Sequence, residues 1–369
     1  MEFAIPREIM ALVKSSGWRR KAKNLRKKLS DFSEFFKSRD YSSPDALFFS
    51  VEDLPPLGKE YWFLHFSAPP SDSQVVITLG RSAEQVEVNQ SELSPAGEEQ
   101  GGKQGKSGGN IKCAAVCWLY SGKKSVLFDS IADVRISRGK TKSSLEASNG
   151  GNRASISGDY PDFDIRLSQK GKELFFARAC FPQEGVPYEM IYLLKTPPVP
   201  HLSSAMINYY FDFNGKLLGK PMSGKAYLQK VVAVMPLAPW NWVRVNFKNG
   251  ACLDFFSGKP LGGVPAIHFA DNAYFEEKGV RTKISGDLSL ASFMEGEGRV
   301  WVLSGKDFFL SMRAYSLQPF IMKQRTTFRY DEYLVRVTDF AFKSGGKEHS
   351  LSSLGGGRGI VEEASGYLL

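Results

Sequence analysis

The chain has 369 residues, which is long for one domain and accommodates two domains of ordinary size. Its 42% hydrophobic and 13% aromatic residues can fill buried cores, which excludes an intrinsically disordered protein. The net charge of +9 is concentrated near the N-terminus, so the remainder is only mildly basic and no nucleic-acid partner is predicted.

The first predicted unit, residues 1–44, is a basic amphipathic helical segment. Apolar residues recur at three- to four-residue spacing from Pro6 to Asp40, which is the pattern of one or two helices. Residues 18–36 combine this apolar stripe with Lys and Arg, so they could contact an anionic membrane surface or pack on the protein's own β-structure. No signal peptide and no apolar run of about 18 residues is found. A cytoplasmic location, peripheral to the membrane at most, is therefore expected.

From residue 45 onward the pattern changes to short strands. Runs such as Tyr61–Ser67, Gln74–Arg81 and Lys112–Tyr120 are separated by turn residues, which favours antiparallel barrels or sandwiches. Residues 94–110 are rich in Gly and Gln and are predicted to form a flexible loop. The Pro-rich segment 196–201 is predicted to be an exposed crossing segment or loop rather than a central strand. We therefore predict a first β-domain over residues 45–205 and a second over 206–369.

The most informative stretch is Met222–Phe256, near the start of the second predicted domain. Asn249-Gly250 separates two strand-like runs and predicts a hairpin with a type I′ turn, in which both central residues have positive φ. A further turn is predicted at Asn214-Gly215, after the strand-like run Ala205–Phe213. On the first hairpin strand, Trp240, Trp242 and Arg244 share one face. They line either a ligand pocket or a barrel core with Arg244 at its rim.

Several motifs in this part of the chain occur in an order that resembles the hydroxyneurosporene synthase family, which includes carotenoid 1,2-hydratase and the AttH-like, lipocalin-like proteins. They are Tyr209-Tyr210-Phe211, Ser223–Tyr227, Trp240-Asn241-Trp242 and Asn249-Gly250, with Glu60–Phe63 similar to the family's opening strand and Gly359–Tyr367 to its closing strand. The resemblance implies a mostly β fold of two tandem lipocalin-like (calycin-like) antiparallel β-barrels behind the N-terminal helical segment. It also implies a ligand cavity within or between the barrels.

Two departures from the family pattern bear on chemistry. Leu228-Gln229-Lys230 follows Tyr227 where family members often carry Asp-His or Asp-x, and Asn241 stands where Asp is common. Hydration of an isolated double bond needs a strong acid, aromatic faces that stabilise the cation and a positioned water. A carboxyl group in apolar surroundings can supply the acid. Asp254 is the nearest such carboxyl, on the face of its strand that also carries Cys252 and Phe256. The alternative is that Asp254 is an ordinary solvent-exposed residue of this strand with no catalytic role.

The predicted site therefore has Asp254 as acid and Tyr227 as a cation-stabilising catalytic residue. The predicted ligand-binding residues are Trp240, Trp242, Arg244, Gln229 and Tyr209. The expected partner is a hydrophobic isoprenoid or lipid, and the expected reaction is hydration or cyclisation of a carbon–carbon double bond. The alternative from another class is a non-catalytic carrier of a hydrophobic small molecule. The four histidines show no metal-ligand spacing, so no metal and no cofactor is predicted.

Overall fold

The computed structural model describes residues 43–94, 110–139, 142–182, 187–194, 203–234, 237–258 and 269–368. The predicted N-terminal helices before residue 43, nearly all of the predicted 94–110 loop and the Pro-rich segment 196–201 lie outside these ranges. Within them, no helix is both long enough and apolar enough to cross a membrane.

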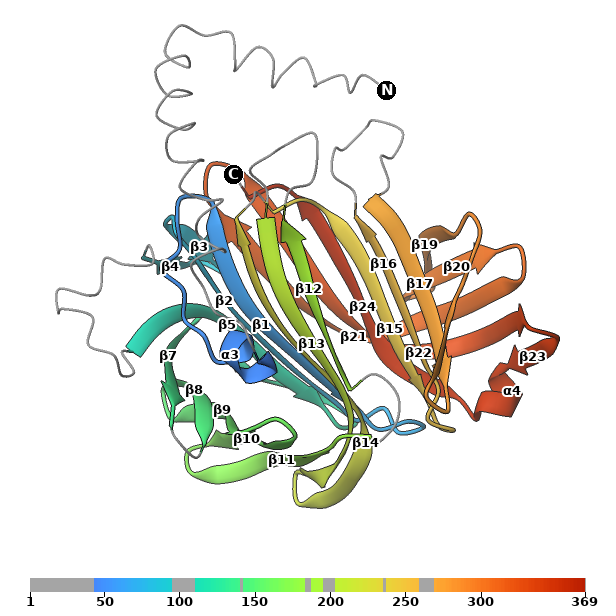
Figure 1. Cartoon of the computed structure of the whole chain (residues 1–369), viewed down its shortest axis with the longest axis horizontal. Helices are drawn as coiled ribbons and strands as arrows, with labels where there is room; N and C mark the ends of the chain where they lie inside the picture. Colours follow the sequence, from blue (N-terminus) through green and yellow to red (C-terminus); the bar gives the residue numbers. More distant parts are fainter. Residues whose placement is uncertain are drawn as a thin grey trace, which may run out of the picture.

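Antiparallel strands form almost all of the described chain, in two sheets (Figure 1). The first sheet contains β1 (Gly58–Ser67), β2 (Gln74–Ser82), β5 (Asn110–Tyr120), β6 (Lys124–Phe128), β7 (Ile131–Arg138), β8 (Ser143–Asn149), β9 (Asn152–Asp159), β10 (Asp162–Gln169), β11 (Lys172–Cys180), β12 (Tyr188–Leu194), β13 (Ser203–Leu217) and β14 (Lys220–Val234). The second contains β3 (Val86–Val88), β4 (Ser91–Leu93), β15 (Trp240–Phe247), β16 (Cys252–Gly258), β17 (Phe269–Glu277), β18 (Val280–Lys283), β19 (Ser289–Glu295), β20 (Gly298–Gly305), β21 (Phe308–Lys323), β22 (Thr327–Ser344), β23 (Lys347–Ser350) and β24 (Gly357–Gly366). Two short helices, α3 (Pro44–Phe48) and α4 (Leu351–Leu354), complete the described elements.

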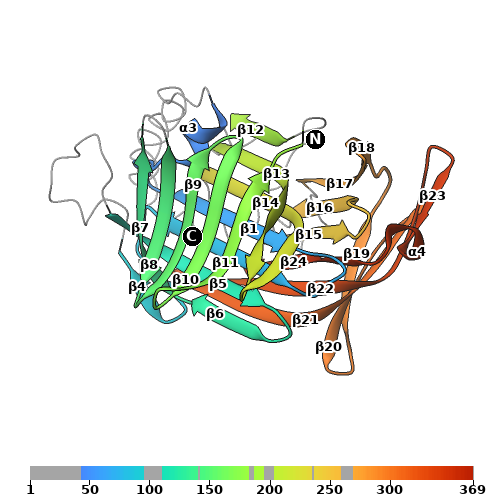
Figure 2. The same ribbon diagram turned by 90° about the horizontal axis from the view of Figure 1, so that it is seen from below.

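The first sheet closes into a barrel. Its strands follow the order β11-β10-β9-β8-β7-β5-β2-β1-β14-β13, and β13 pairs back onto β11. Helix α3 lies at one end of this barrel (Figure 2), and Phe48 packs with Phe163 and Tyr209 among the inward side chains. Trp62 anchors the helix because its Nε1 donates to the carbonyl oxygen of Phe48 at 2.8 Å. The barrel interior is therefore a packed core.

The second sheet packs against the outside of the barrel, which leaves β1 covered on both faces. Alternation directs Trp62 into the barrel core, whereas Phe63 joins a separate cluster between the sheets. That cluster contains Trp118 and Tyr227 from the barrel and Tyr330 and Ile360 from the second sheet. In the described part of the second sheet, β18 lies at one edge and β19 at the other, and these two strands do not pair with each other. The mostly β, tandem lipocalin-like fold class predicted from the sequence is confirmed.

The chain passes from the first sheet to the second at a later residue than the predicted domain boundary between 205 and 206. Strand β13 pairs with β14, β14 pairs with β1 of the barrel, and the second sheet begins its main run at Trp240. In the opposite direction, β3 from the N-terminal half pairs with β21 of the second sheet. The chain leaves the first sheet after Val234 and enters the main run of the second sheet at Trp240. The division into domains at 45–205 and 206–369 remains a prediction.

The predicted turn at Asn214-Gly215 is wrong, because both residues lie inside β13. Gly215 pairs with Ala177 at the barrel closure, and a Cβ there would lie 1.8 Å from the carbonyl oxygen of Phe176. Glycine is thus required for close approach of two strands. The turn lies instead at Leu218 and Gly219, whose φ values of 51° and 79° suit a type I′ hairpin.

The predicted hairpin at Asn249-Gly250 is confirmed, but its turn type differs. Strands β15 and β16 pair directly, and the Phe247 N–H donates to the Ala251 carbonyl at 2.8 Å, which leaves residues 248–250 as the loop. Gly250 has φ of 90°, whereas Asn249 is absent from the positive-φ residues of this loop. A three-residue loop with one left-handed glycine therefore replaces the type I′ turn.

Two buried carboxyl groups face each other at the interface between the sheets. Glu332 of β22 pairs in register with Glu362 of β24, and the Tyr330 hydroxyl donates to Glu362. Across the interface, Glu332 accepts from Thr78 Oγ1 at 2.6 Å and from Trp118 Nε1 at 2.7 Å. Burial raises the pKa of Glu332 to about 7 and that of Glu362 to about 8, although these hydrogen bonds oppose the shift. Near neutral pH the pair therefore holds protons that the unfolded chain has released.

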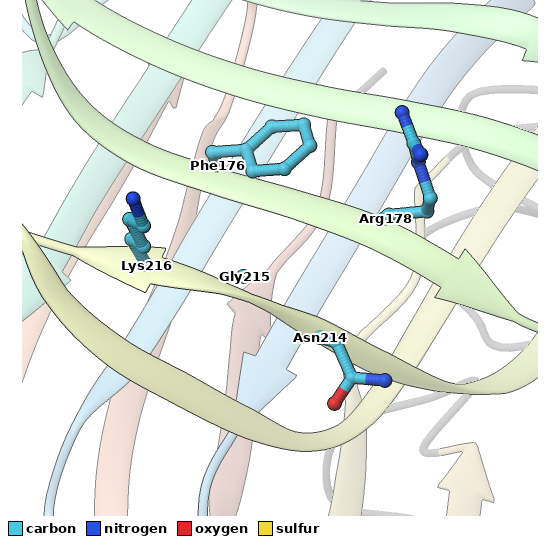
Figure 3. Close-up of a pocket in the computed structure, with 5 residues that line it drawn as sticks. All are labelled: Phe176, Arg178, Asn214, Gly215 and Lys216. Atoms are coloured by element: carbon cyan, nitrogen blue, oxygen red, sulfur yellow. The ribbon is translucent and has the colours of Figure 1, made fainter.

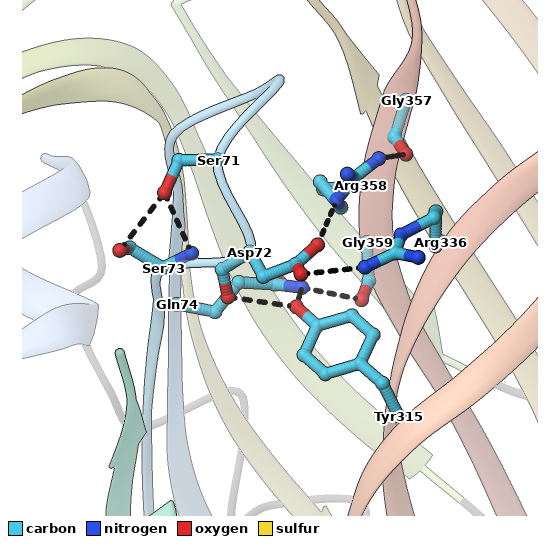
Figure 4. Close-up of polar contacts among 9 residues, drawn as sticks. All are labelled: Ser71, Asp72, Ser73, Gln74, Tyr315, Arg336, Gly357, Arg358 and Gly359. Atoms are coloured by element: carbon cyan, nitrogen blue, oxygen red, sulfur yellow. Dashed lines mark hydrogen bonds and ion pairs between the residues drawn. The ribbon is translucent and has the colours of Figure 1, made fainter. Parts of the chain in front are cut away.

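A second polar cluster joins the sheets around Asp72 (Figure 4). Its carboxylate forms ion pairs with Arg336 of β22 and Arg358 of β24. Burial opposes ionisation of Asp72, but the two arginines outweigh it and hold the pKa of this carboxyl below its ordinary value. Nearby, Gln74 of β2 donates to the Tyr315 hydroxyl and to the Gly359 carbonyl. Ion pairs and hydrogen bonds thus hold this end of the interface, together with the ring contact of Tyr315 and Tyr120 at 4.8 Å.

Replacing Gly215 with Ala should destabilise the protein by more than the same change at Gly219. The Gly219 variant has free space and only meets the left-handed backbone cost of about 1–2 kcal/mol. At Gly215 the added methyl collides with backbone, so the barrel closure must shift. Urea unfolding measures both free energies, and equal losses would contradict the role assigned to the β11–β13 contact.

Stability should fall as pH rises from about 4.5 to 8, and Glu332→Gln or Glu362→Gln should reduce this slope. Because the native carboxyls bind protons more tightly than the unfolded ones, their contribution is lost as pH passes their native pKa values, by on the order of 3 kcal/mol for each group. Chemical unfolding across this pH range tests the difference. Glu87→Gln, at an exposed pair with Lys323, is the control. An unchanged slope in the double Gln variant would refute the assignment.

Candidate functional site

A pocket of about 310 Å³ lies where the outside of the barrel meets the second sheet. Barrel strands β13 and β14 contribute Tyr210 and Lys225, and the second sheet contributes Arg244, Asp254 and Arg281. Tyr274 of β17 and the 248–250 turn complete much of the wall. The pocket thus needs both sheets, and its lining is rich in charged and aromatic side chains.

The Arg244–Asp254 ion pair lies at the centre of this wall. The two residues are register partners on β15 and β16, so strand alternation turns both side chains to the barrel side. Arg244 is only 2% exposed although it lines the pocket. Burial alone would lower the pKa of Arg244, but the Asp254 carboxylate outweighs it and raises that pKa. The guanidinium of Arg244 therefore stays charged although it is buried.

Guanidinium groups and phenol rings alternate along the pocket. Arg244 lies 5.1 Å from the Tyr210 ring centroid and 5.0 Å from that of Tyr227. Arg281 lies 5.9 Å from Tyr210 and 4.2 Å from Tyr274, so Tyr210 stands between two cations. Burial raises the pKa of Tyr210, and its neutral hydroxyl donates to Glu189 at 3.3 Å. The row offers both hydrogen-bond donors and flat apolar faces to a ligand.

The structure brings Tyr227 and Trp242 together beside the pocket. Their rings are 5.2 Å apart, and Trp242 also meets Phe63 of β1 at 5.4 Å. Trp240 lies farther along β15, where its Nε1 donates to Glu362 at 3.1 Å and its ring packs on Tyr330. Neither indole is among the residues that line the pocket. Both pack between the sheets, and of the two only Trp242 lies next to the Tyr227 ring that Arg244 contacts.

Gln229 and Tyr209 occupy different surroundings. Gln229 donates to the Tyr227 hydroxyl at 2.7 Å and to Asn208 Oδ1 at 3.0 Å, so it helps to fix the position of the Tyr227 hydroxyl. Tyr209 points into the barrel core and donates to Asp45 of the first turn of α3 at 3.0 Å. Its neighbour Tyr210 faces the pocket instead. Of the predicted residues, Arg244 and Asp254 line the pocket, and Tyr227, Trp242 and Gln229 lie beside them. Trp240 packs with Tyr330 farther along the interface, and Tyr209 lies inside the barrel.

Lys230, part of the departure from the family pattern, also points into the barrel. It forms an ion pair with Glu60 and lies 3.3 Å from the Trp62 ring centroid. Burial lowers the pKa of Lys230 to about 8 despite this partner. Lys230 thus contributes to the barrel interior and not to the pocket between the sheets.

Sequence reasoning missed Tyr210, Tyr274 and Arg281. Tyr210 lies within the paired-Tyr motif, but strand alternation alone does not tell which of two adjacent tyrosines faces the barrel interior. Tyr274 and Arg281 come from β17 and β18, which join the pocket only through sheet pairing. In the described ranges, no group of three or more His, Cys, Asp or Glu side chains is placed to hold a metal ion.

A second hollow of about 340 Å³ lies on the outer surface of the barrel, lined by Phe176, Arg178, Asn214, Gly215 and Lys216 (Figure 3). Its charged residues, Arg178 and Lys216, are exposed to solvent. Exposed charges of this kind are the ordinary surface of a strand pair. The pocket between the sheets, with its buried ion pair, is the better candidate site.

Replacing Arg244 with Met should cost about 3 kcal/mol of stability, since it leaves Asp254 without its partner in a largely buried position. Asp254→Asn should also destabilise, and the double variant should lose less than the sum of the two. Arg281→Met is the control, because its 3.5 Å pair with Glu189 is more exposed and is worth about 1 kcal/mol or less. Urea unfolding of the four variants measures the coupling, and strictly additive losses would contradict it.

No protein-family model and no curated protein matches the sequence. Among solved structures, the chain is similar to a candidate AttH from Nitrosomonas europaea at 14% identity, covering 84% of this chain and 93% of that chain with a TM-score of 0.46. It is also similar to CghA at 10% identity, covering 84% and 88% with a TM-score of 0.44. Kievitone hydratase from Nectria haematococca shares 9% identity, with 83% and 88% covered and a TM-score of 0.39.

Proposed function

We propose that the protein binds a small, largely apolar molecule with an oxygen-bearing end in the pocket between the sheets, and acts on it by proton transfer at a carbon–carbon double bond. The observation that carries the proposal is Arg244, a guanidinium that is nearly inaccessible yet lines the pocket and is paired with a carboxylate. Perturbed charged groups in a concave site are candidates for ligand binding and catalysis.

The lining favours a ligand of two parts. Arg244 and Arg281 can hydrogen-bond a carbonyl or carboxylate oxygen, while the rings of Tyr210 and Tyr274 present apolar faces. A volume of about 310 Å³ lies at the lower end of the range for small-molecule pockets. An isoprenoid or lipid substrate would place its oxygen-bearing end here and extend its chain outward. A membrane-peripheral segment at residues 18–36 would suit such a substrate.

The chemistry favoured by this pair differs from protonation of an isolated double bond. Asp254 forms an ion pair with Arg244, and we assign it the role of base in place of the role of acid first predicted for it. Arg244 can stabilise negative charge that develops on a carbonyl oxygen. The best-supported reaction is therefore hydration or isomerisation of a double bond conjugated to a carbonyl group. In hydration, Asp254 takes a proton from water as the hydroxide adds to the β-carbon, Arg244 holds the enolate oxygen, and the proton then returns to the α-carbon. In isomerisation, Asp254 takes the proton from the γ-carbon instead and returns it to the α-carbon.

The alternative function, a non-catalytic carrier, needs a different binding site from the barrel interior. The barrel interior, where a lipocalin-type carrier would hold its cargo, is filled by side chains such as Phe48, Phe163 and Tyr209. A carrier would have to use the pocket between the sheets as well. The two functions therefore share a binding site and differ only in whether Asp254 performs chemistry.

The discriminating experiment begins with native mass spectrometry of the purified protein to identify a co-purifying small molecule. With that molecule, Asp254→Asn should keep binding and lose turnover by on the order of 10²-fold or more, because the amide cannot accept the proton. Arg244→Met should weaken binding and turnover together.

Lys216→Ala, in the surface hollow, is the control and should change neither quantity. Full turnover in Asp254→Asn would exclude Asp254 as the base. Binding without any turnover in the unmodified protein would favour the carrier.

A further inference from the structure

Three polar atoms buried between β1 and β15 have no hydrogen-bond partner among the described residues. They are His65 Nδ1, Arg244 Nε and Asn246 Oδ1, on side chains that are 0%, 2% and 1% exposed. A buried polar atom in this state is unfavourable, because it has lost its hydrogen bonds to water and gained none in return. Three such atoms in one place indicate a bound group that satisfies them together.

The three atoms lie in one place because β15 follows β1 across the interface. Phe63 meets Trp242 at a ring distance of 5.4 Å, and Ser67 Oγ accepts from Asn246 Nδ2 at 2.7 Å. Alternation places His65 between Phe63 and Ser67 on one strand, and Arg244 between Trp242 and Asn246 on the other. His65 therefore faces Arg244, whose charge helps to lower the pKa of His65.

The hydrogen bonds around His65 assign its tautomer. Gln74 Nε2 donates to the Tyr315 hydroxyl and to the Gly359 carbonyl, so Gln74 Oε1 is the atom 2.5 Å from His65 Nε2. Nε2 must then carry the proton, and Nδ1 is a hydrogen-bond acceptor. Burial lowers the pKa of His65 to about 4, so the ring is neutral near pH 7.

We propose that one water molecule is bound here, donating to His65 Nδ1 and Asn246 Oδ1 and accepting from Arg244 Nε. Two acceptors and one donor require a group that gives two protons and takes one. An alkyl hydroxyl has one proton to give, and an ammonium group has no lone pair. Buried waters typically make about three hydrogen bonds of this kind.

The water site makes His65 and Asn246 positioning residues for Arg244. The guanidinium is then held at Nη1 by Asp254 and at Nε by the water, which fixes its plane against the barrel. Neither His65 nor Asn246 lines the pocket, so both act through Arg244. This inference is independent of the proposed function and holds for any ligand of the pocket.

Histidine NMR on the full chain labelled with ¹⁵N-His tests the tautomer. A His65→Gln variant assigns the His65 signals among the four histidines. The expected result is a neutral ring protonated at Nε2 from pH 8 to below pH 5. A ring protonated at Nδ1, or a cation at pH 7, overturns the proposal because Nδ1 would then face Arg244 Nε as a second donor.

The water itself is tested by a crystal structure of the unmodified full chain, with oxygen-sized density expected within hydrogen-bond distance of all three atoms. Absence of that density, or direct pairing of His65 with Asn246, overturns the proposal. In solution, Asn246→Leu should shift the Arg244 Nε–H resonance and hasten its exchange with solvent. Asn241→Leu, on the opposite face of β15, is the matched control and should leave that resonance unchanged. The same response in both variants would also count against the water.

Discussion

The rest of the structure depends on one packing event, the covering of the barrel's outer face by the second sheet. Strand β1 shows its effect, because Trp62 points into the barrel and Phe63 into the interface, and almost no residue of the strand meets water. Polar side chains on this outer face have lost solvent and must find partners across the gap. Thr78 and Trp118 hydrogen-bond to Glu332. Ser67 hydrogen-bonds to Asn246, and Gln74 to Tyr315. The interface is therefore specified by hydrogen bonds as well as by apolar contact, and its buried carboxyls make it sensitive to pH.

The pocket arises where this covering ends. Strands β15, β16 and β17 carry charged residues on the same face that packs against the barrel farther along. Arg244 belongs to both regions, since its chain is buried with Tyr227 while its head group reaches Asp254 at the pocket wall. A charge held in this way gains strength from its low-dielectric surroundings and cannot relax toward bulk water. That combination of rigidity and accessibility to a ligand is what distinguishes this wall from the exposed hollow beside Phe176.

The filled barrel changes what a lipocalin-like fold offers to a ligand. Helix α3, the aromatic side chains around Tyr209 and the Lys230–Glu60 pair occupy the interior, so the barrel serves as a scaffold. The candidate pocket lies on its outside instead, where the barrel and the second sheet supply opposite walls.

The amino-acid sequence by itself determined the β class, the hairpin at Asn249-Gly250, and the shared faces of Trp240, Trp242 and Arg244 and of Asp254 with Cys252. These features depend on residues a few positions apart, which alternation and turn chemistry relate directly. The tertiary structure decided why Gly215 lies in a strand, since a close approach to Phe176 has no local signature. It also decided that Tyr210 and not Tyr209 faces the pocket, and that Glu332 meets Glu362 in the interface. Each of these depends on which face of a strand is covered and by what, and that is set by pairings between residues far apart in the chain.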